Sequence, residues 1–386
     1  MNRRLHDRCR DRFAATDFMK HVVVDARMIT NAGIGRFLQQ LLDVLVRDIR
    51  FRLTLLGDQS QLRRYDADGG RVTVVHCNPP LYSIHEQISL PRAIPECDLF
   101  YAPHYVVPLL YRGPYVVTVN DVIHLERADF APGRIAQLYA RFMIVRAVRR
   151  AQRVVTLSEY SKQKITALAG ETDTHIEVVY PAVAPIFFAP PEDDFVARVL
   201  DHYGLKRPYL LFVGNAKRHK NLETLVRALA TLRDLGRQYQ LAVVGEFRSI
   251  RSSIDELRRL VLELNLTQSV SFLGKIPDDE LVAVYRGAHL FVFPSLAEGF
   301  GLPPLEGMAC GIPVLAARMT ATPEVCGDAA EYYDQPEDPR SLADAVLALD
   351  ASPNRRLELV SLGAKRARQF AGSESTHKIV ELLYRS

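Results

Sequence analysis

The chain has 386 residues, of which 48% are hydrophobic and 24% are charged, with a formal net charge of +4. This length favours two domains, and the composition is ordinary for a soluble globular protein. The small net charge argues against a nucleic-acid partner, and no apolar run approaches the roughly 20 residues that a membrane-spanning helix needs.

The cysteines and the N-terminus point to an intracellular setting. The five cysteines are scattered and no two have Cys-x-x-Cys spacing, so neither a zinc site nor a disulfide framework is predicted. A reducing, cytoplasmic compartment is the simple inference. Residues 1–20 contain five arginines but no apolar core, so they do not form a secretory signal. We interpret them as a basic tail that we expect to be disordered.

Residues 21–187 alternate between apolar strands and helical patterns, which indicates an N-terminal domain with a parallel sheet covered by helices. A glycine-rich segment follows the first strand, and a helix then runs to about Arg47. Gly33 and Gly35 lack the third glycine of a dinucleotide fingerprint and lie too far after the strand, which disfavours a dehydrogenase. An ordinary tight turn is the alternative for these glycines. The expected strands are His21–Asp25, Phe51–Leu56, Val72–His76, Asp98–Tyr101, Tyr115–Val119, Arg153–Leu157 and Ile176–Tyr180.

Asp121 is the candidate functional residue of this domain. It follows a predicted strand at the carboxyl edge of the sheet, where open α/β sheets bind ligands. The segment Asp66-Ala67-Asp68 is the only Asp-x-Asp in the chain. It lies in a polar turn and not at the end of an apolar strand, so no metal site is predicted there.

The segment Arg134–Arg153 carries six arginines and no acidic residue. Apolar residues recur in it at steps of three and four, as in an amphipathic helix: Ile135, Leu138, Phe142, Val145 and Val148. Three interpretations are open. The apolar stripe can pack on the sheet and leave the arginines in solvent, the helix can lie on an anionic membrane surface, or the arginines can hold an anionic lipid-diphosphate acceptor.

Prolines and acidic residues predict an interdomain linker over 188–206, and a second strand–helix series then predicts a C-terminal domain over 207–373. A final helix is expected within 374–386. The expected strands of the second domain are Pro208–Val213, Gln240–Val244, Ser269–Leu273, His289–Phe293 and Pro313–Ala316.

The turn after the first strand of this second domain is rich in cations. It runs from Gly214 and Asn215 to Lys220 and opens the next helix. Cations and backbone N–H groups at a strand-to-helix turn are typical of a phosphate site. A solvated cationic loop is the alternative.

The chain is organised around the segment 295–314, in which a glycine-flanked turn lies between an apolar strand and a helix that opens on two prolines. Proline suits a first helical position because its missing N–H has no partner there. Gly299, Phe300 and Gly301 thus lie at a helix N-terminus and at the carboxyl end of a strand. Free N–H groups and the positive helix end favour a phosphate at that place.

Two glutamates flank this turn. Glu298 and Glu306 are eight residues apart, or about 12 Å at helical rise. Carboxylates accept hydrogen bonds from sugar hydroxyls, so a ligand with phosphate in the middle and a hydroxyl-bearing ring at each end fits the spacing. A nucleotide-sugar is such a ligand. The alternatives are a helix-dipole partner for Glu306 and a solvated loop acid for Glu298.

This stretch resembles the Glu-x7-Glu motif of family 4 of the retaining glycosyltransferases. The resemblance extends from 270–276 through the motif to Pro323-Glu324-Val325 and 336–338. It implies the GT-B fold: two Rossmann-like domains that face a central cleft, with a C-terminal helix crossing back to the N-terminal domain. It also implies sugar transfer with retention of configuration, without a metal and without a cofactor.

The resemblance also implies roles for single residues. Glu298 would hold the sugar and Glu306 the ribose, while Lys220 and Arg218 would stabilise the leaving diphosphate, with Lys217 as runner-up to Arg218. Asp121 completes the expected catalytic set, although family members often have His-Asp where this chain has Asn120-Asp121. His124 could substitute for that histidine, but a structural histidine is the favoured interpretation. The expected donor-binding residues also include Gly33, Gly35, Gly214, Asn215, Ile276, Gly299, Phe300, Gly301 and Leu302.

The expected donor is GDP-mannose, because the segment Leu302-Pro303-Pro304-Leu305 looks like that of many family members that use this donor. UDP-glucose, UDP-N-acetylglucosamine and dTDP-rhamnose are the alternatives. The expected acceptor is a saccharide or lipid-linked saccharide of surface-polysaccharide synthesis. We expect a cytoplasmic enzyme that can be peripheral on the inner face of the membrane. A nucleotide-sugar epimerase and a catalytically silent nucleotide-sugar-binding scaffold are rival hypotheses.

Overall fold

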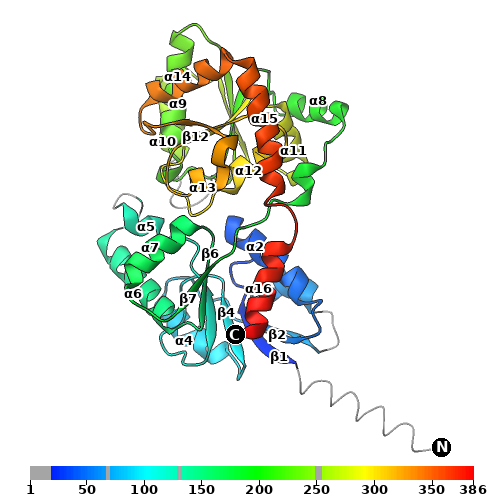
Figure 1. Cartoon of the computed structure of the whole chain (residues 1–386), viewed down its shortest axis with the longest axis vertical. Coiled ribbons are helices and arrows are strands. Elements are labelled where there is room, and N and C mark those ends of the chain that lie inside the picture. Colours follow the sequence, from blue (N-terminus) through cyan, green and yellow to red (C-terminus); the bar gives the residue numbers. More distant parts are fainter. Residues whose placement is uncertain (1–18, 67–69, 128–129, 131–132, 248–253) are drawn as a thin grey trace, which may run out of the picture.

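The computed structural model describes residues 19–66, 70–127, 130, 133–247 and 254–386. Two α/β domains lie one above the other along the long axis of the molecule (Figure 1). The N-terminal basic tail lies outside the described residues, apart from residues 19 and 20, and so does most of Asp66-Ala67-Asp68.

The N-terminal domain is built on a seven-stranded, all-parallel sheet in the order β3-β2-β1-β4-β5-β6-β7. The order reverses beside β1, and such a switch point places a crevice at the carboxyl edge of the strands. The central strands are almost wholly buried, as expected for a sheet covered on both faces. The strands are β1 (Lys20–Asp25), β2 (Phe51–Gly57), β3 (Val72–His76), β4 (Leu99–Ala102), β5 (Tyr115–Thr118), β6 (Arg153–Thr156) and β7 (His175–Val178).

The helices of this domain begin where the sequence offers capping side chains. Ser158 accepts the N–H of Ser161 at the start of α7, and Ser83 accepts the N–H of Glu86 at the start of α4. The helices are α2 (Ala32–Leu45), α3 (Gln59–Leu62), α4 (Ile84–Ala93), α5 (Ile123–Glu126), α6 (Arg134–Arg150) and α7 (Glu159–Ala169).

Helix α6 corrects one interpretation of the arginine-rich segment. Its buried face consists of small and apolar residues, among them Ala140, Met143 and Ile144. Three members of the predicted apolar stripe, Ile135, Leu138 and Phe142, are exposed. The interpretation that the whole stripe packs on the sheet is therefore wrong, because alanines spaced along the other face allow a closer approach to the core.

The predicted linker over 188–206 contains a helix, α8 (Asp193–His202). Val196, Val199 and Leu200 of α8 are buried in a core cluster of the second domain. Apolar residues at helical spacing, with acids in the first turn at the positive end of the dipole, outweigh the linker-like composition. Most of this segment therefore packs as part of the C-terminal domain.

The C-terminal domain has a six-stranded parallel sheet in the order β10-β9-β8-β11-β12-β13. Its last strand, which has only three residues, was not expected. The strands are β8 (Tyr209–Val213), β9 (Gln240–Val244), β10 (Val270–Gly274), β11 (Leu290–Phe293), β12 (Val314–Ala317) and β13 (Glu331–Tyr333). The α-helices after α8 are α9 (Leu222–Asp234), α10 (Ile254–Glu263), α11 (Asp278–Gly287), α12 (Leu302–Ala309), α13 (Thr322–Cys326), α14 (Pro339–Asp350) and α15 (Pro353–Arg368).

The last helix, α16 (Glu374–Arg385), returns to the N-terminal domain, as predicted, and ends near β1 and β2 (Figure 1). Ile379 and Leu383 are fully buried in the core cluster of that domain. Lys378 donates to the carbonyl of Val178 at 2.9 Å. Within the described residues, no helix has both the length and the apolarity to cross a membrane.

Candidate active site

The candidate active site lies where loops at the carboxyl ends of both sheets meet. The centre of this site is an ion pair between Lys220 and Glu298. The Lys220 Nζ lies 2.6 Å from Oε1 and 2.9 Å from Oε2 of Glu298. Only 14% of the lysine side chain and 9% of the glutamate side chain are exposed. The sequence predicted both residues, 78 positions apart, and the fold brings them into direct contact.

The backbone around the pair is held by two neighbouring loops. The Leu296 N–H donates to the carbonyl of His219 at 2.7 Å, which ties the loop after β11 to the turn after β8. The Glu298 N–H donates to Oγ1 of Thr320 at 2.9 Å. Burial, and next the charge of Lys220, lower the pKa of His219 to about 4, so its imidazole is neutral at pH 7. The positive charge on this turn therefore comes from lysine and arginine.

Gly299 makes the closest approach between the two domains at the site. A Cβ added there would lie 2.7 Å from Cβ of Asp121 and 3.0 Å from the carbonyl oxygen of Asn120. Ser158 and Ser161 donate their hydroxyls to the Gly299 carbonyl at 2.6 and 3.2 Å. Glycine is required because any side chain would push the glutamate-bearing loop away from the N-terminal domain.

Asp121 faces the same cleft from the N-terminal domain. Burial raises its pKa, while the electrostatic interaction with His124 and the hydrogen bond from the N–H of Ile123 act in the opposite direction. Glu298 raises the pKa of Asp121 further and Lys220 lowers it, so the three groups belong to one electrostatic cluster. The predicted functional aspartate is thus next to the ion pair.

Glu306 lies on α12 and is 5% exposed. Its Oε2 accepts the hydroxyl of Tyr285 at 3.1 Å, and its Oε1 accepts Nη1 of Arg36 at 3.2 Å. Burial raises the pKa of Glu306, and Arg36 opposes that effect. Because Glu306 is buried and pairs with the buried Tyr285 and with Arg36, the simple helix-dipole alternative does not describe its environment.

Arg36 connects the two domains across the cleft. It extends from α2 and pairs with Asp278 at 2.8 Å as well as with Glu306. The sequence reasoning missed Arg36, Asp278 and Tyr285, because nothing in their local patterns indicates that they meet at Glu306.

The turn between β11 and α12 contributes backbone groups. Gly301 precedes the first residue of α12 and has a φ of 97°, a conformation that favours glycine. The Phe300 ring is buried against Tyr180 and Phe370, with centroids 5.8 and 5.6 Å away. A donor contact at Phe300 would therefore come from its main chain.

Four further predicted donor residues come from the same domain. Ile276 is buried in the core, and Leu302 is half-buried against that core. The buried Oδ1 of Asn215 has no hydrogen-bond partner among the residues that the structure describes, so it can accept a ligand hydrogen bond. Gly214, beside Asn215, lies so close to Gly245 that a Cβ on Gly245 would be 1.9 Å from the Gly214 carbonyl oxygen.

The glycine-rich segment of the N-terminal domain differs from the expected loop. Helix α2 begins at Ala32, so Gly33 and Gly35 lie in its first turns. Gly33 has open space around it, whereas a Cβ on Gly35 would lie 2.5 Å from the carbonyl oxygen of Ile29. Asn31 precedes the helix in an extended conformation without a side-chain capping bond, which leaves backbone N–H groups at this helix end.

The comparisons with known proteins agree on one family. The family model described as glycosyl transferases group 1 matches residues 202–366. A D-inositol 3-phosphate glycosyltransferase of Corynebacterium jeikeium is 30% identical over 284 residues, which cover 71% of this chain and 68% of the relative. The chain belongs to the group 1 glycosyl transferases. An O-antigen chain mannosyltransferase B of Escherichia coli is 27% identical over 73% of each chain.

Solved structures agree with the fold of this glycosyltransferase. A sucrose-phosphate synthase from Thermosynechococcus elongatus superimposes with a TM-score of 0.76 at 20% identity, over 95% of this chain and 98% of the other. The Anabaena protein Alr3699/HepE in complex with UDP-glucose has a TM-score of 0.75 at 18% identity, over 95% and 100%. The predicted two-domain GT-B fold is thus confirmed.

The Arg218 side chain of the glycosyltransferase makes fewer interactions than Lys220 in the same cationic turn. It lies in a short 3-10 helix and is exposed, and its side chain forms no hydrogen bond or ion pair with other residues in the described parts of the chain. Its assignment to the leaving diphosphate stays a prediction.

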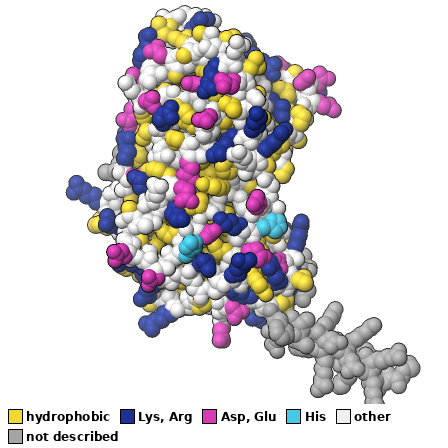
Figure 2. Space-filling model, in the orientation of Figure 1, with side chains coloured by type: hydrophobic (Ala, Val, Ile, Leu, Met, Phe, Trp, Pro, Cys, Tyr) yellow, Lys and Arg dark blue, Asp and Glu magenta, His cyan; other side chains and the backbone are white. Residues whose placement is uncertain are grey.

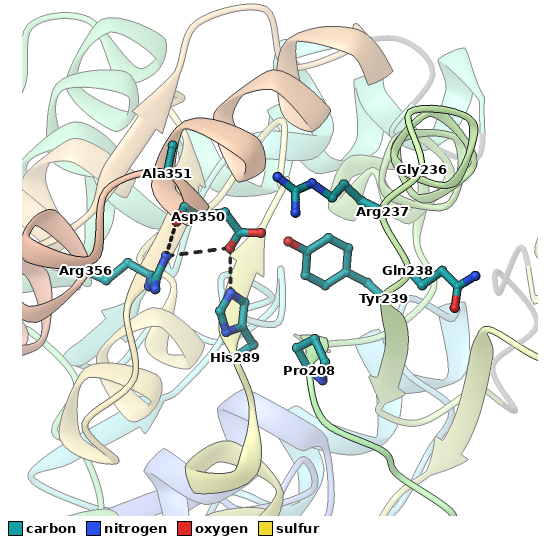
Figure 3. A pocket seen from close by; sticks show the side chains of 9 residues that line it. All are labelled: Pro208, Gly236, Arg237, Gln238, Tyr239, His289, Asp350, Ala351 and Arg356. Carbon is teal, nitrogen blue, oxygen red and sulfur yellow. Dashed lines mark hydrogen bonds and ion pairs between the residues drawn. The ribbon is translucent and has the colours of Figure 1, made fainter.

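A cavity of about 580 Å³ lies elsewhere in the glycosyltransferase (Figure 3). Its lining residues include Pro208, Tyr239 and His289, which precede or begin strands of the second sheet. It is therefore at the amino edge of that sheet, opposite the edge that carries Glu298. His289 and Arg356 converge there on Asp350 (Figure 3). This cavity is not part of the candidate active site.

In the part of the glycosyltransferase that the structure describes, no cluster of three or more acidic, histidine or cysteine side chains could hold a metal ion. The prediction of a metal-independent reaction remains a prediction.

Proposed function

We propose that this glycosyltransferase moves mannose from GDP-mannose to a saccharide or lipid-linked saccharide, with retention of configuration and without a metal or cofactor. The observation that carries the proposal is the position of the Lys220–Glu298 pair, beside Gly299 and within electrostatic range of Asp121. It joins a cation, a sugar-binding carboxylate and an acidic residue of the opposite domain within one cleft.

In this proposal the second domain holds the donor. Glu298 accepts hydroxyls of the transferred sugar, and Glu306 accepts hydroxyls of the ribose. Lys220 and the backbone N–H groups at the start of α12 stabilise the negative charge that develops on the leaving diphosphate. Arg218 is exposed at the same turn and can turn toward the phosphates.

The first domain would present the acceptor. Asp121 lies opposite Glu298 and close enough to influence it electrostatically, so it can orient an acceptor hydroxyl. The close approach of Gly299 to the Asp121 side chain and the Asn120 carbonyl leaves little room for water at the point of transfer, which would suppress hydrolysis.

The choice of GDP-mannose rests on the segment Leu302–Leu305 and on the names of relatives. One relative is described as an O-antigen chain mannosyltransferase B. The Anabaena structure in complex with UDP-glucose supports a nucleotide-sugar donor but favours the second candidate, a UDP-sugar. We also propose a cytoplasmic location, because scattered cysteines without a pairing pattern suit a reducing compartment.

The test is a turnover assay with GDP-mannose and lipid-linked saccharide acceptors, with and without a chelator. Release of GDP that depends on the acceptor and survives chelation, together with an α-linkage in the product by NMR, is the expected result. Donor binding without release of nucleotide would favour a silent scaffold. Turnover with UDP- or dTDP-sugars alone would favour the alternative donors.

A further inference from the structure

The N-terminal domain has an unusual surface that we call the arginine–apolar face. It consists of the exposed side chains of α4, of residues 109–112 and of α6. Large apolar side chains project from all three segments: Ile84 is 82% exposed, Leu110 70%, Ile135 86%, Leu138 68% and Phe142 56%. Single exposed apolar residues are normal, but a group of them marks an interaction site.

Hydrogen bonds show that the three segments form one surface. Gln87 of α4 donates to the hydroxyl of Tyr139 on α6 at 3.4 Å and accepts the N–H of Leu109 at 2.9 Å. Arg146 of α6 donates to the carbonyl of Leu109 at 2.7 Å. Figure 1 shows α4 and α6 on the same side of the N-terminal domain. The exposed apolar residues are therefore neighbours in space.

The charge of this face is of one sign. Helix α6 carries arginines but no acidic residue. Elsewhere, exposed arginines pair with acids on the same helix, as Arg340 does with Asp344 and Arg227 with Glu223. Both signs are also interspersed over the face of the molecule shown in Figure 2. An ordinary solvated helix face therefore does not explain why α6 carries charges of one sign only.

A shallow cavity of about 530 Å³ lies along α6 and combines the two features. Its lining residues are Leu138, Arg141, Phe142, Val145, Arg146, Arg149 and Arg150. Arg149 is anchored on the carbonyl of Ala169 at 2.9 Å. The side chains of Arg141 and Arg150 are exposed and make no hydrogen bond or ion pair with any described residue. They remain available for an anion beside an apolar rim.

We propose that the arginine–apolar face docks on an anionic phospholipid bilayer. Leu110, Ile135, Leu138 and Phe142 enter the headgroup region, while Arg141 and Arg150 contact lipid phosphates. Exposed apolar side chains next to unpaired cations are the features that bind a helix to such an interface.

A row of rings connects this face to the candidate active site. Tyr82, just before α4, contacts His104 at a centroid distance of 5.6 Å, and His104 contacts Tyr105 at 4.1 Å. Tyr105 stacks on His124 at 5.6 Å, and His124 interacts electrostatically with Asp121. If the proposed function holds, this row joins the arginine–apolar face to the residue that orients the acceptor.

The test is co-sedimentation of the whole chain with vesicles of phosphatidylcholine, with or without one-third phosphatidylglycerol. We expect binding to the anionic vesicles that weakens as salt rises. Arg141→Gln with Arg150→Gln should lower the partition coefficient about 25-fold, since each surface cation contributes roughly a factor of five. Leu138→Ser with Phe142→Ser should lower it at least about tenfold. All four sites are exposed, so the melting temperature should change little.

Matched controls come from the C-terminal domain. Leu262→Ser with Leu357→Ser removes two apolar residues of similar exposure, 63% and 69%. Lys365→Gln with Arg368→Gln removes two exposed charges from α15. Neither pair should change vesicle binding. Every variant keeps residues 1–18, so a contribution of their arginines is common to all.

Four outcomes would overturn the proposal, and none depends on the glycosyltransferase assay. The first two are equal binding to neutral and anionic vesicles, and equal losses of binding in the control variants. The third is tight binding of RNA that vesicles do not displace. The fourth is the absence of vesicle binding together with a dimer in sedimentation velocity that Leu138→Ser with Phe142→Ser dissociates.

Discussion

The charges of Lys220 and Glu298 are held together in a place that is nearly closed to water. Removing one partner of a buried pair leaves the other without a counter-charge, which costs about 3–5 kcal/mol. Because 14% of the Lys220 side chain and 9% of the Glu298 side chain are still exposed to solvent, we expect the lower end of that range. The pair therefore has a structural role as well as its proposed role in transfer.

We predict that Lys220→Met lowers the free energy of unfolding by about 3 kcal/mol, and that adding Glu298→Gln restores most of it. Both variants should lose at least about 100-fold in kcat/KM, because neither retains the cation that stabilises the leaving group. Denaturant unfolding and turnover measure the two effects separately. A single variant as stable as the double variant would contradict a buried ion pair.

Glu306 gives a prediction about pH. Burial raises its folded-state pKa above its usual value of 4.5. At a pH between the unfolded-state pKa and the raised folded-state pKa, the folded state holds a proton that the unfolded state has lost. Glu306 therefore makes the free energy of unfolding fall as pH rises through that window. The stability advantage of Glu306→Gln over the natural chain should therefore grow as pH rises above about 4.5. Melting temperatures of both proteins from pH 4 to 8 provide the measurement, and a difference that does not change with pH would count against the prediction.

At the scale of elements, the sequence predicted most strands to within one or two residues, because buried parallel strands are short apolar runs between turns. The strand β13 was missed since three residues give no measurable pattern. The helix α8 was missed since prolines and acids concealed its apolar spacing. The two glycines of α2 suggested a loop, although the chain from Ala32 onward is helical.

Helix α2 offers a paired test of those glycines. Gly33→Ala should be neutral or stabilise the protein by up to about 1 kcal/mol, because alanine is the better helix former and nothing lies within 4 Å of the new methyl group. Gly35→Ala should destabilise it, because its Cβ would lie 2.5 Å from the Ile29 carbonyl oxygen. Thermal unfolding of both variants is the measurement. Equal effects would mean that the first turns of α2 are placed differently.

At the scale of the whole molecule, the contacts between domains could not be predicted. Glu298, Lys220 and Asp121 were found because each follows a strand at a carboxyl edge. Arg36 and Ser158 reach the site from the other domain, and only the packing of the two domains brings them there. Local patterns contain no information about which distant helix end faces which loop.

Glu324 provides a test of this domain contact. Its carboxylate, in the C-terminal domain, accepts the N–H groups of Glu159 and Tyr160 at 2.7 and 2.9 Å, at the N-terminus of α7 in the other domain. Losing such a cap costs about 1 kcal/mol, so Glu324→Ala should shift the protein toward a more open arrangement. We expect a larger radius of gyration by small-angle scattering, while Glu324→Gln, which keeps one acceptor, should change it less. Identical scattering curves for all three proteins would contradict this role.

The most direct test of the proposed donor site is a thermal-shift panel with GDP-mannose, UDP-glucose, UDP-N-acetylglucosamine, dTDP-rhamnose and NAD. A ligand that binds only the folded state at a hundredfold excess over its Kd stabilises that state by about 2.7 kcal/mol. We predict a shift with GDP-mannose that disappears in Lys220→Met and in Glu306→Ala. No shift with any nucleotide-sugar, or a shift that both variants retain, would contradict the donor site proposed at Glu298 and Glu306.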